Sequence, residues 1–163
     1  MLNQFDHEKL DVYRLELQFL SWVTVLLAEL DGSGKRLGEI IDQLDRASLS
    51  ALLNTAEGNG KRQQRVRAKF FDDARGSATE CAACLDGLVA KQACVKARID
   101  EGKQLLLRGV SILSKLVARF EDPQNLREEA PPYRVSGEPP TVEDENEDDH
   151  ENDHENDSPR RSP

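Results

Sequence analysis

The sequence predicts an all-α protein: an antiparallel up-and-down four-helix bundle followed by a disordered acidic C-terminal tail. Three observations lead to this prediction. Apolar residues recur at helical spacing through residues 6–120. Short turns rich in glycine interrupt this pattern, and no segment of the sequence reads convincingly as a strand. After Pro123 the composition becomes acidic and rich in proline. We therefore divide the chain into a helical domain, 1–122, and a tail, 123–163.

Four helices are expected from the periodicity and from the residues that interrupt it. Asp6 is expected to cap the first helix, glycines separate the first three, and Pro123 ends the fourth because proline cannot continue a helix. Short turns between consecutive helices favour antiparallel neighbours in a bundle. The expected helical segments are 6–30, 36–56, 63–91 and 95–120.

The net acidity of the chain is confined to its tail. The 163 residues carry a formal net charge of −9. Residues 1–122 hold 18 basic and 18 acidic residues, whereas residues 123–163 hold 4 and 13. The low isoelectric point therefore does not argue against a nucleic-acid partner for the helical domain. The segment 141–158 is almost entirely Glu, Asp, Asn and His, and it cannot bury enough apolar surface to offset the entropy lost on ordering.

The sequence favours a cytoplasmic protein without a membrane partner. Asp6, Glu8 and Asp11 stand where an export signal would carry cations. The longest weakly charged run, 17–28, is too short to span a bilayer as a helix. The three cysteines are an odd number within one helical stretch, which makes a poor disulfide framework. A reducing compartment is the natural setting for such a chain.

The first helix carries more apolar surface than a simple bundle requires. One stripe consists of Val12, Leu15, Phe19, Trp22, Val23, Leu26 and Leu30. A second consists of Leu10, Tyr13, Leu17, Leu20 and Leu27. A helix that is apolar on most of its circumference is buried on most of it. We favour self-association as the source of this burial in so small a domain; the alternative is a deep core helix covered by its own bundle.

The residues that suggest metal or redox chemistry have simpler explanations. Cys81 and Cys84 form a Cys-x-x-Cys pair, but only Cys94 could add a further thiol and no strand precedes the pair. We therefore interpret these residues as small buried core thiols. His7 is expected to be solvated, and His150 and His154 lie in the tail, where no fixed coordination geometry is expected. No metal site and no cofactor is predicted.

Enzyme classes that use recognisable motifs are also disfavoured. The segment 58–61 lacks the strand and the spacing of a phosphate-binding loop and is interpreted as a helix end and turn. A carboxylate-bridged metal enzyme would place Glu-x-x-His motifs on facing helices, and none occurs in the expected helices. We therefore predict no catalytic residues.

One cluster of cations is a candidate binding surface. Five basic residues fall within nine positions that contain no acid, around the second turn and the start of the third helix. Cations are mildly unfavourable at a helix N-terminus because of the helix dipole, which hints at another use such as phosphate contacts. An ordinary solvated face is the alternative. The candidate nucleic-acid contacts are Lys61, Arg62, Arg65, Arg67 and Lys69.

Three segments resemble a known family. The segments 5–13, 41–58 and 70–80 are similar to the bacterial four-helix bundle proteins first noticed as products of intervening sequences in large-subunit ribosomal RNA genes. That group includes the accessory variability determinant proteins of diversity-generating retroelements. Thr55, Cys81 and Cys84 depart from its usual pattern. The matching positions are Gln43, Arg46, Ala47, Ser48, Ser50, Asn54, Ala56, Glu57, Gly58, Ala74, Arg75, Gly76, Ser77 and Glu80.

The resemblance covers roughly residues 5–120 and carries several expectations. It implies a four-helix bundle that assembles as a homopentamer and has no known enzymatic activity. For the retroelement relatives it implies binding to a reverse transcriptase and to nucleic acid through a basic surface. The acidic tail is not part of the family pattern, so the resemblance implies nothing about it.

These observations lead to a functional expectation with one open alternative. We expect a non-enzymatic oligomeric bundle that binds RNA or DNA, or a nucleic-acid enzyme such as a reverse transcriptase. The alternative is a protein-interaction scaffold with no nucleic-acid role. Arg46 and Arg75 are expected to reach a carboxylate, such as Glu57 or Glu80, and to fix the helix register. The tail is expected to compete with nucleic acid for the basic residues.

Overall fold

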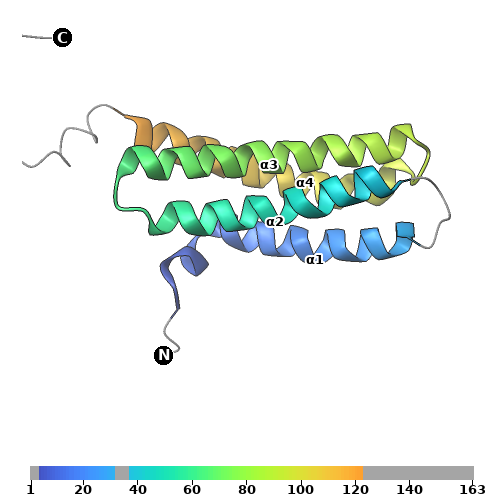
Figure 1. The fold of residues 1–163 in the computed structure, drawn as a ribbon, viewed down its shortest axis with the longest axis horizontal. Helices are drawn as coiled ribbons and strands as arrows, with labels where there is room; N and C mark the ends of the chain where they lie inside the picture. The colour runs from blue at the N-terminus through green and yellow to red at the C-terminus, as the bar shows by residue number, and fades with distance from the viewer. Residues whose placement is uncertain (1–3, 32–36, 123–163) are drawn as a thin grey trace, which may run out of the picture. The chain divides into compact units, whose positions relative to one another are not determined.

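The computed structural model describes residues 4–31 and 37–122. Within them the chain forms a short 3₁₀ turn, η1 (Asp6–Lys9), and four α-helices. Successive helices run in opposite directions, and each packs against its neighbours in chain order while α4 returns to α1 (Figure 1). The predicted antiparallel four-helix bundle is confirmed for this part of the chain. The helices are α1 (Asp11–Asp31), α2 (Gly38–Gly60), α3 (Gln64–Ala90) and α4 (Lys96–Glu121). The predicted tail, 123–163, lies outside the described residues.

The start of the first helix differs from the prediction. Residues 6–9 form η1, and the extended backbone of Leu10 separates this turn from α1. Asp6 therefore does not cap α1, and its carboxylate instead pairs with Lys9 at 2.8 Å. The backbone N–H of Phe5 donates to Glu8 Oε2 at 2.7 Å, so the acid that closes this turn is Glu8.

The second helix runs four residues beyond its predicted end, through two glycines that we took as breakers. Gly58 is helical, and a Cβ atom placed on it would lie 2.9 Å from Phe70 Cβ and 3.3 Å from the Phe71 ring. Glycine is thus required because α3 approaches the end of α2 closely. The helix ends at Gly60, immediately before the turn into α3.

The turn between α3 and α4 is a Schellman motif without glycine. The N–H of Ala93 donates to Leu88 O, and the N–H of Gln92 donates to Val89 O, both at 2.9 Å. Gln92 occupies the left-handed position of this motif with φ 57°. Glycine usually stands there because a side chain is strained in that region.

The interior of the bundle is divided into two apolar clusters. The larger contains Phe19, Leu44, Leu85 and Leu88 and extends toward the α3–α4 turn. The smaller lies nearer the α2–α3 turn and contains Val12, Phe71, Ala74, Leu113 and Val117. Along α1, Glu16 lies between Val12 of the smaller cluster and Phe19 of the larger one. A buried glutamate therefore lies at the boundary between the two clusters.

The bundle itself covers most of the apolar surface of α1. Six of the seven residues in the first stripe are buried, and Trp22 is half-buried. In the second stripe only Leu17 is exposed, at 41 %. Val25, which belongs to neither stripe, is exposed at 57 %. The alternative interpretation, in which the bundle itself buries α1, thus accounts for most of the apolar surface of this helix. Self-association stays a prediction.

An aromatic contact joins α1 to α4. The Trp22 ring lies where a side chain on Gly102 would be, since a Cβ atom there would lie 2.3 Å from the ring. The guanidinium of Arg98 lies 5.3 Å from the centre of the Trp22 ring and makes two hydrogen bonds, of 2.9 and 3.0 Å, to the Glu29 carboxylate. These hydrogen bonds lower the pKa of Glu29. Gly102 therefore sets how closely α4 approaches α1.

Candidate nucleic-acid interface and a buried polar layer

The five predicted basic residues lie together around the α2–α3 turn and the first turns of α3 (Figure 1). Arg62 and Arg65 are exposed and make no hydrogen bond or ion pair with any residue that the structure describes. Arg65 and Lys69 line a surface hollow together with Asp72 and Glu121. The candidate surface is therefore basic but bordered by acids, and its two unpaired cations are the arginines at 62 and 65.

Arg67 has a structural role that charge patterning did not predict. Its guanidinium donates to the backbone carbonyls of Gly58 at 3.3 Å and Asn59 at 2.9 Å, which satisfies carbonyls at the end of α2. It also lies 5.0 Å from the centre of the Phe120 ring in α4. Arg67 thus ties the α2–α3 turn to α4, and its side chain is only partly exposed.

Two lysines flank an aromatic ring on this surface. Lys61 Nζ lies 4.8 Å and Lys69 Nζ 5.7 Å from the centre of the half-buried Phe70 ring. Each lysine also pairs with an acid on its own helix or turn, Lys61 with Glu57 at 2.7 Å and Lys69 with Asp73 at 2.8 Å. The bond to Asp73 raises the pKa of Lys69. Both lysines can exchange these exposed partners for a phosphate, because surface ion pairs are weak.

The family-like motif residues lie along the outer contact between α2 and α3. Gln43 Nε2 donates to Glu80 Oε1 of α3, and Arg46 Nη2 donates to Gln43 Oε1. Further along, the hydroxyls of Ser50 and Ser77 are 3.0 Å apart and hydrogen-bonded across the two helices. These two bridges fix the relative position of α2 and α3 at the surface.

A second set of motif contacts stays within one helix. Asn54 Nδ2 donates to the backbone carbonyl of Ser50 at 3.0 Å. Ser77 Oγ also makes a 3.0 Å contact with Asp73 O one turn earlier in α3. Gly76 is exposed, and a Cβ atom added to it would meet nothing within 4 Å.

The ion pairs expected of the motif arginines are not the ones observed. Arg75 donates to Asp72 of its own helix at 2.5 Å, and Glu57 pairs with Lys61. Arg46 reaches α3 only indirectly, through the amide of Gln43. The expectation of direct cross-helix ion pairs is therefore wrong. A carboxylate three residues away on the same helix is a nearer partner than one on the facing helix.

The most perturbed acid of the described bundle was missed at the sequence level. Glu16 on α1 is only 7 % exposed, and Thr55 Oγ1 of α2 donates to its Oε1 at 2.8 Å. Burial away from water raises the pKa of Glu16 to about 8, although the Thr55 hydrogen bond acts in the opposite direction. The Glu16 carboxyl group is thus mainly protonated in the folded protein at neutral pH.

A signal for Glu16 is present in the sequence. Positions 12, 16, 19, 23, 26 and 30 alternate steps of four and three, which is the spacing of one buried helical face. Our apolar stripe replaced Glu16 by its neighbour Leu15, because an acid is rarely fully buried. Both residues are buried in the structure.

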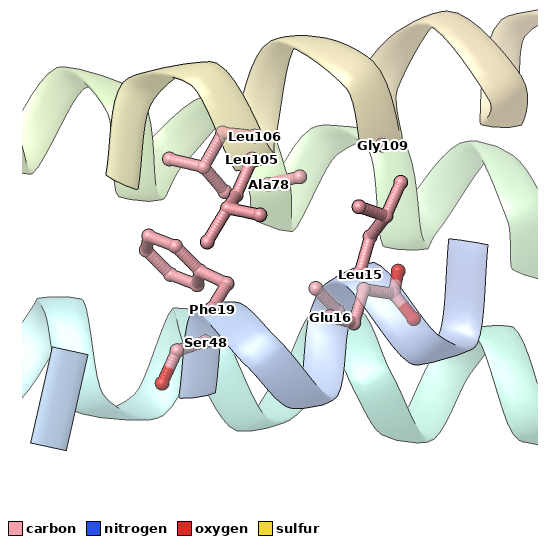
Figure 2. Close-up of a pocket in the computed structure, with 9 residues that line it drawn as sticks. Leu15, Glu16, Phe19, Ser48, Ala78, Leu105, Leu106 and Gly109 are labelled. Carbon is pink, nitrogen blue, oxygen red and sulfur yellow. The ribbon is translucent and has the colours of Figure 1, made fainter. Parts of the chain in front are cut away.

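Glu16 lines a small cavity at the boundary between the two apolar clusters. Side chains and backbone from all four helices surround it (Figure 2). The Oε2 atom of Glu16 is buried and has no hydrogen-bond partner among the described residues. The lining residues are Leu15, Glu16, Phe19, Ser48, Ala51, Ala78, Leu105, Leu106 and Gly109.

The cysteines behave as core residues. Cys81 is fully buried and Cys84 half-buried, and neither forms a disulfide. Burial raises the pKa of Cys81 to about 12 and also raises that of Cys84. Neither thiol is therefore poised as a nucleophile. Among the residues that the structure describes, no group of three or more His, Cys, Asp or Glu side chains is arranged to hold a metal ion.

The fold and these surfaces define a helical-bundle protein with a basic α2–α3 turn and a strip of polar side chains between α2 and α3. The strip consists of Gln43, Arg46, Ser50, Ser77 and Glu80. The family profile described as 23S rRNA-intervening sequence protein matches residues 8–116, which span nearly the whole bundle. The chain belongs to this family. No curated protein and no solved structure matches it. Searched over the described residues, no helix is long and apolar enough to cross a membrane.

Proposed function

We propose that this protein is a non-enzymatic, homo-oligomeric bundle that binds nucleic acid, or an enzyme acting on nucleic acid, through the basic residues around the α2–α3 turn. The observation that carries the proposal is the exposure of Arg62 and Arg65 together with their lack of an ion-pair partner among the described residues. Both are exposed and neither is neutralised by a described neighbour. Guanidinium groups in this state are suited to phosphate oxygens, which they bind with two parallel hydrogen bonds.

The surroundings of these arginines support the same partner. Lys61 and Lys69 add positive charge on either side of the Phe70 ring. Cations beside an aromatic ring are typical of surfaces that bind nucleic acid without sequence preference. A single patch of this size binds weakly, but an oligomer would repeat it and several copies would act together. A homopentamer and a reverse transcriptase partner are part of this proposal through the family resemblance alone.

Salt-dependent binding tests the proposal. Fluorescence anisotropy with a structured RNA and a duplex DNA, at two or more salt concentrations, measures both the affinity and its salt slope. The double variant Arg62→Gln/Arg65→Gln is expected to bind more weakly and to lose about 0.7–0.9 of log–log salt slope for each phosphate contact removed. The matched control, Lys91→Gln/Lys96→Gln, removes the same charge at the α3–α4 turn, at the opposite end of the bundle (Figure 1).

The outcomes distinguish the proposal from its alternative. Equal losses in the two double variants would show that only net charge matters and would refute the site. Absence of binding at low salt, by the full chain and by a chain ending at residue 122, would end the nucleic-acid proposal. The alternative scaffold is supported by Leu49 and Leu53, which are 46 % and 56 % exposed one turn apart on α2. It predicts protein partners whose capture is insensitive to nuclease.

A further inference from the structure

A second basic surface lies on α4, apart from the α2–α3 turn. Between Gly102 and Phe120 this helix contains four cations and no acid. Lys103 reaches α3, where it pairs with Asp86 at 2.6 Å. The other three cations share one exposed face with a glutamine and a serine, because the five residues follow one another at steps of three or four. We call this surface the α4 basic face, and it consists of Gln104, Arg108, Ser111, Lys115 and Arg119.

Two cations of the α4 basic face have their full charge available. Arg108 and Lys115 are exposed and make no hydrogen bond, ion pair or ring contact with any residue that the structure describes. The nearest acids along the chain lie beyond the two ends of the face, at 100–101 and 121–122. The face therefore offers two unpaired cations to an anion, as many as the basic α2–α3 turn does.

A surface hollow adds another cation beside this face. Arg108 lines the hollow together with Arg14 and Gln18 of α1 and Ile112 of α4. Asp11 also lines it, and its carboxylate lies 3.5 Å from the Arg14 guanidinium. Two guanidinium groups and one carboxylate leave the hollow with a net positive charge. An anionic group can therefore bind where α1 and α4 meet.

The α4 basic face suits a nucleic-acid backbone better than a protein. Its side chains are cations, an amide and a hydroxyl, which are the groups that commonly contact phosphates. None of the five is apolar, whereas the centre of a protein interface is typically built around apolar and aromatic anchors. From Arg108 to Arg119 the face extends about 16 Å along one helix. Over that length each strand of a duplex carries about five phosphates.

The two basic surfaces differ in the form of nucleic acid that they suit. At the α2–α3 turn, Lys61 and Lys69 flank the Phe70 ring, and an aromatic ring beside cations can stack on unpaired bases. The α4 basic face contains no aromatic residue. A surface of this kind contacts phosphates without reading bases, so it needs no unpaired strand.

We propose that the α4 basic face, together with Arg14, is a second nucleic-acid site that binds the phosphate backbone of a duplex. This inference rests on the proposed function for the class of partner and names its form: a structured nucleic acid whose duplex lies along α4 and whose unpaired segment contacts the α2–α3 turn. The end of α4 lies beside that turn (Figure 1). The Phe120 ring lies 5.8 Å from the Arg119 guanidinium and 5.0 Å from that of Arg67 at the turn, so the two sites adjoin.

Two probes separate the sites: a blunt-ended duplex without unpaired bases, and an oligonucleotide of a single base that forms no structure. Both are titrated with the full chain in fluorescence anisotropy at several salt concentrations. Arg108→Gln/Lys115→Gln is expected to weaken duplex binding and to lower the log–log salt slope by roughly 1.8, about 0.9 for each phosphate contact removed. Arg62→Gln/Arg65→Gln is expected to weaken binding of the unpaired probe more than that of the duplex. Lys91→Gln/Lys96→Gln is the charge-matched control, and far-UV circular dichroism verifies that each variant is folded.

The failure of this site can be told apart from the failure of the proposed function. A duplex affinity and salt slope that Arg108→Gln/Lys115→Gln leaves unchanged would overturn the α4 site, while a loss in the Arg62→Gln/Arg65→Gln protein would still uphold the turn. Equal losses in the α4 variant and in the control also contradict the site, because only net charge would then matter. Polyglutamate that displaces the duplex as effectively as unlabelled duplex does would point to an acidic protein partner and overturn the proposal.

Discussion

Replacing Glu16 by glutamine should abolish a specific part of the pH dependence of stability. In the unfolded chain the carboxyl titrates near 4.5, whereas burial raises the pKa in the folded protein to about 8. Between these values the folded state holds a proton that the unfolded state has released. The free energy of unfolding therefore falls as pH rises through this window, by roughly 1.4 kcal/mol per pH unit, and levels off above the folded pKa.

The expected effect is large for a domain of this size. A window of about three pH units corresponds to roughly 4 kcal/mol, compared with total stabilities of about 5–15 kcal/mol for small domains. Glutamine has nearly the same shape but no titration. Glu16→Gln is therefore expected to match the unmodified protein near pH 5 and to exceed it progressively up to pH 8.

The measurement is urea unfolding at pH 5, 6, 7 and 8, followed by far-UV circular dichroism at one fixed protein concentration so that any oligomer contributes equally. The useful quantity is the difference between variant and unmodified protein, since other titrating groups cancel. Glu39→Gln, an exposed acid at the start of α2, is the matched control and is expected to give a flat difference. A flat difference for Glu16→Gln as well, within about 0.5 kcal/mol, would show that the Glu16 carboxyl has the same pKa in the folded and unfolded states, and would refute the reasoning.

Three further predictions follow from single features of the structure. Gly102→Ala places a Cβ atom 2.3 Å from the Trp22 ring and should destabilise the protein by about 1–3 kcal/mol. Because Trp22 is the one tryptophan in the sequence, a shift in its fluorescence should accompany the loss, and an unchanged urea midpoint and spectrum would refute the contact. Gln92→Gly relieves a left-handed φ and should raise stability by up to about 1 kcal/mol; a lower midpoint would show that the Gln92 side chain contributes more than its strain costs. Deleting residues 123–163 removes a net charge of −9 and should raise nucleic-acid affinity at low salt in anisotropy titrations, whereas an unchanged or lower affinity would leave the tail a solubilising role.

The number, order and direction of the helices could be predicted because they depend on local signals. Helical periodicity, short turns and Pro123 are all visible in the sequence. The end of α2 could not be placed, because Gly58 resembles a helix breaker when read locally. In the structure the same glycine is helical and is required by the approach of Phe70 and Phe71. Only the packing of two helices distinguishes these two uses of glycine.

The roles of individual charged residues were harder to predict than the helices. Arg67 belongs to a basic run, but its guanidinium is held by backbone carbonyls of the preceding helix end. Glu16 lies between Leu15 and Leu17 in the sequence. Periodicity alone does not show whether the buried face of α1 includes Glu16 or only its leucine neighbours. Both outcomes depend on contacts between helices. Arg62, Arg65 and Lys69 are the exposed members of the basic run, and of these the two arginines have no ion-pair partner among the described residues.

The polar motif residues between α2 and α3 differ in position from the motif residues Ala47 and Ala74, which belong to the apolar clusters. Gln43, Glu80, Ser50 and Ser77 are partly or fully exposed, and hydrogen bonds or ion pairs in contact with water each contribute little to stability. Gly76 adds an exposed mid-helix glycine that costs stability relative to alanine. The stability of the single bundle therefore resides mainly in the two apolar clusters. The polar side chains between α2 and α3 thus align the two helices at the surface, and they run toward the same turn that presents Arg62 and Arg65.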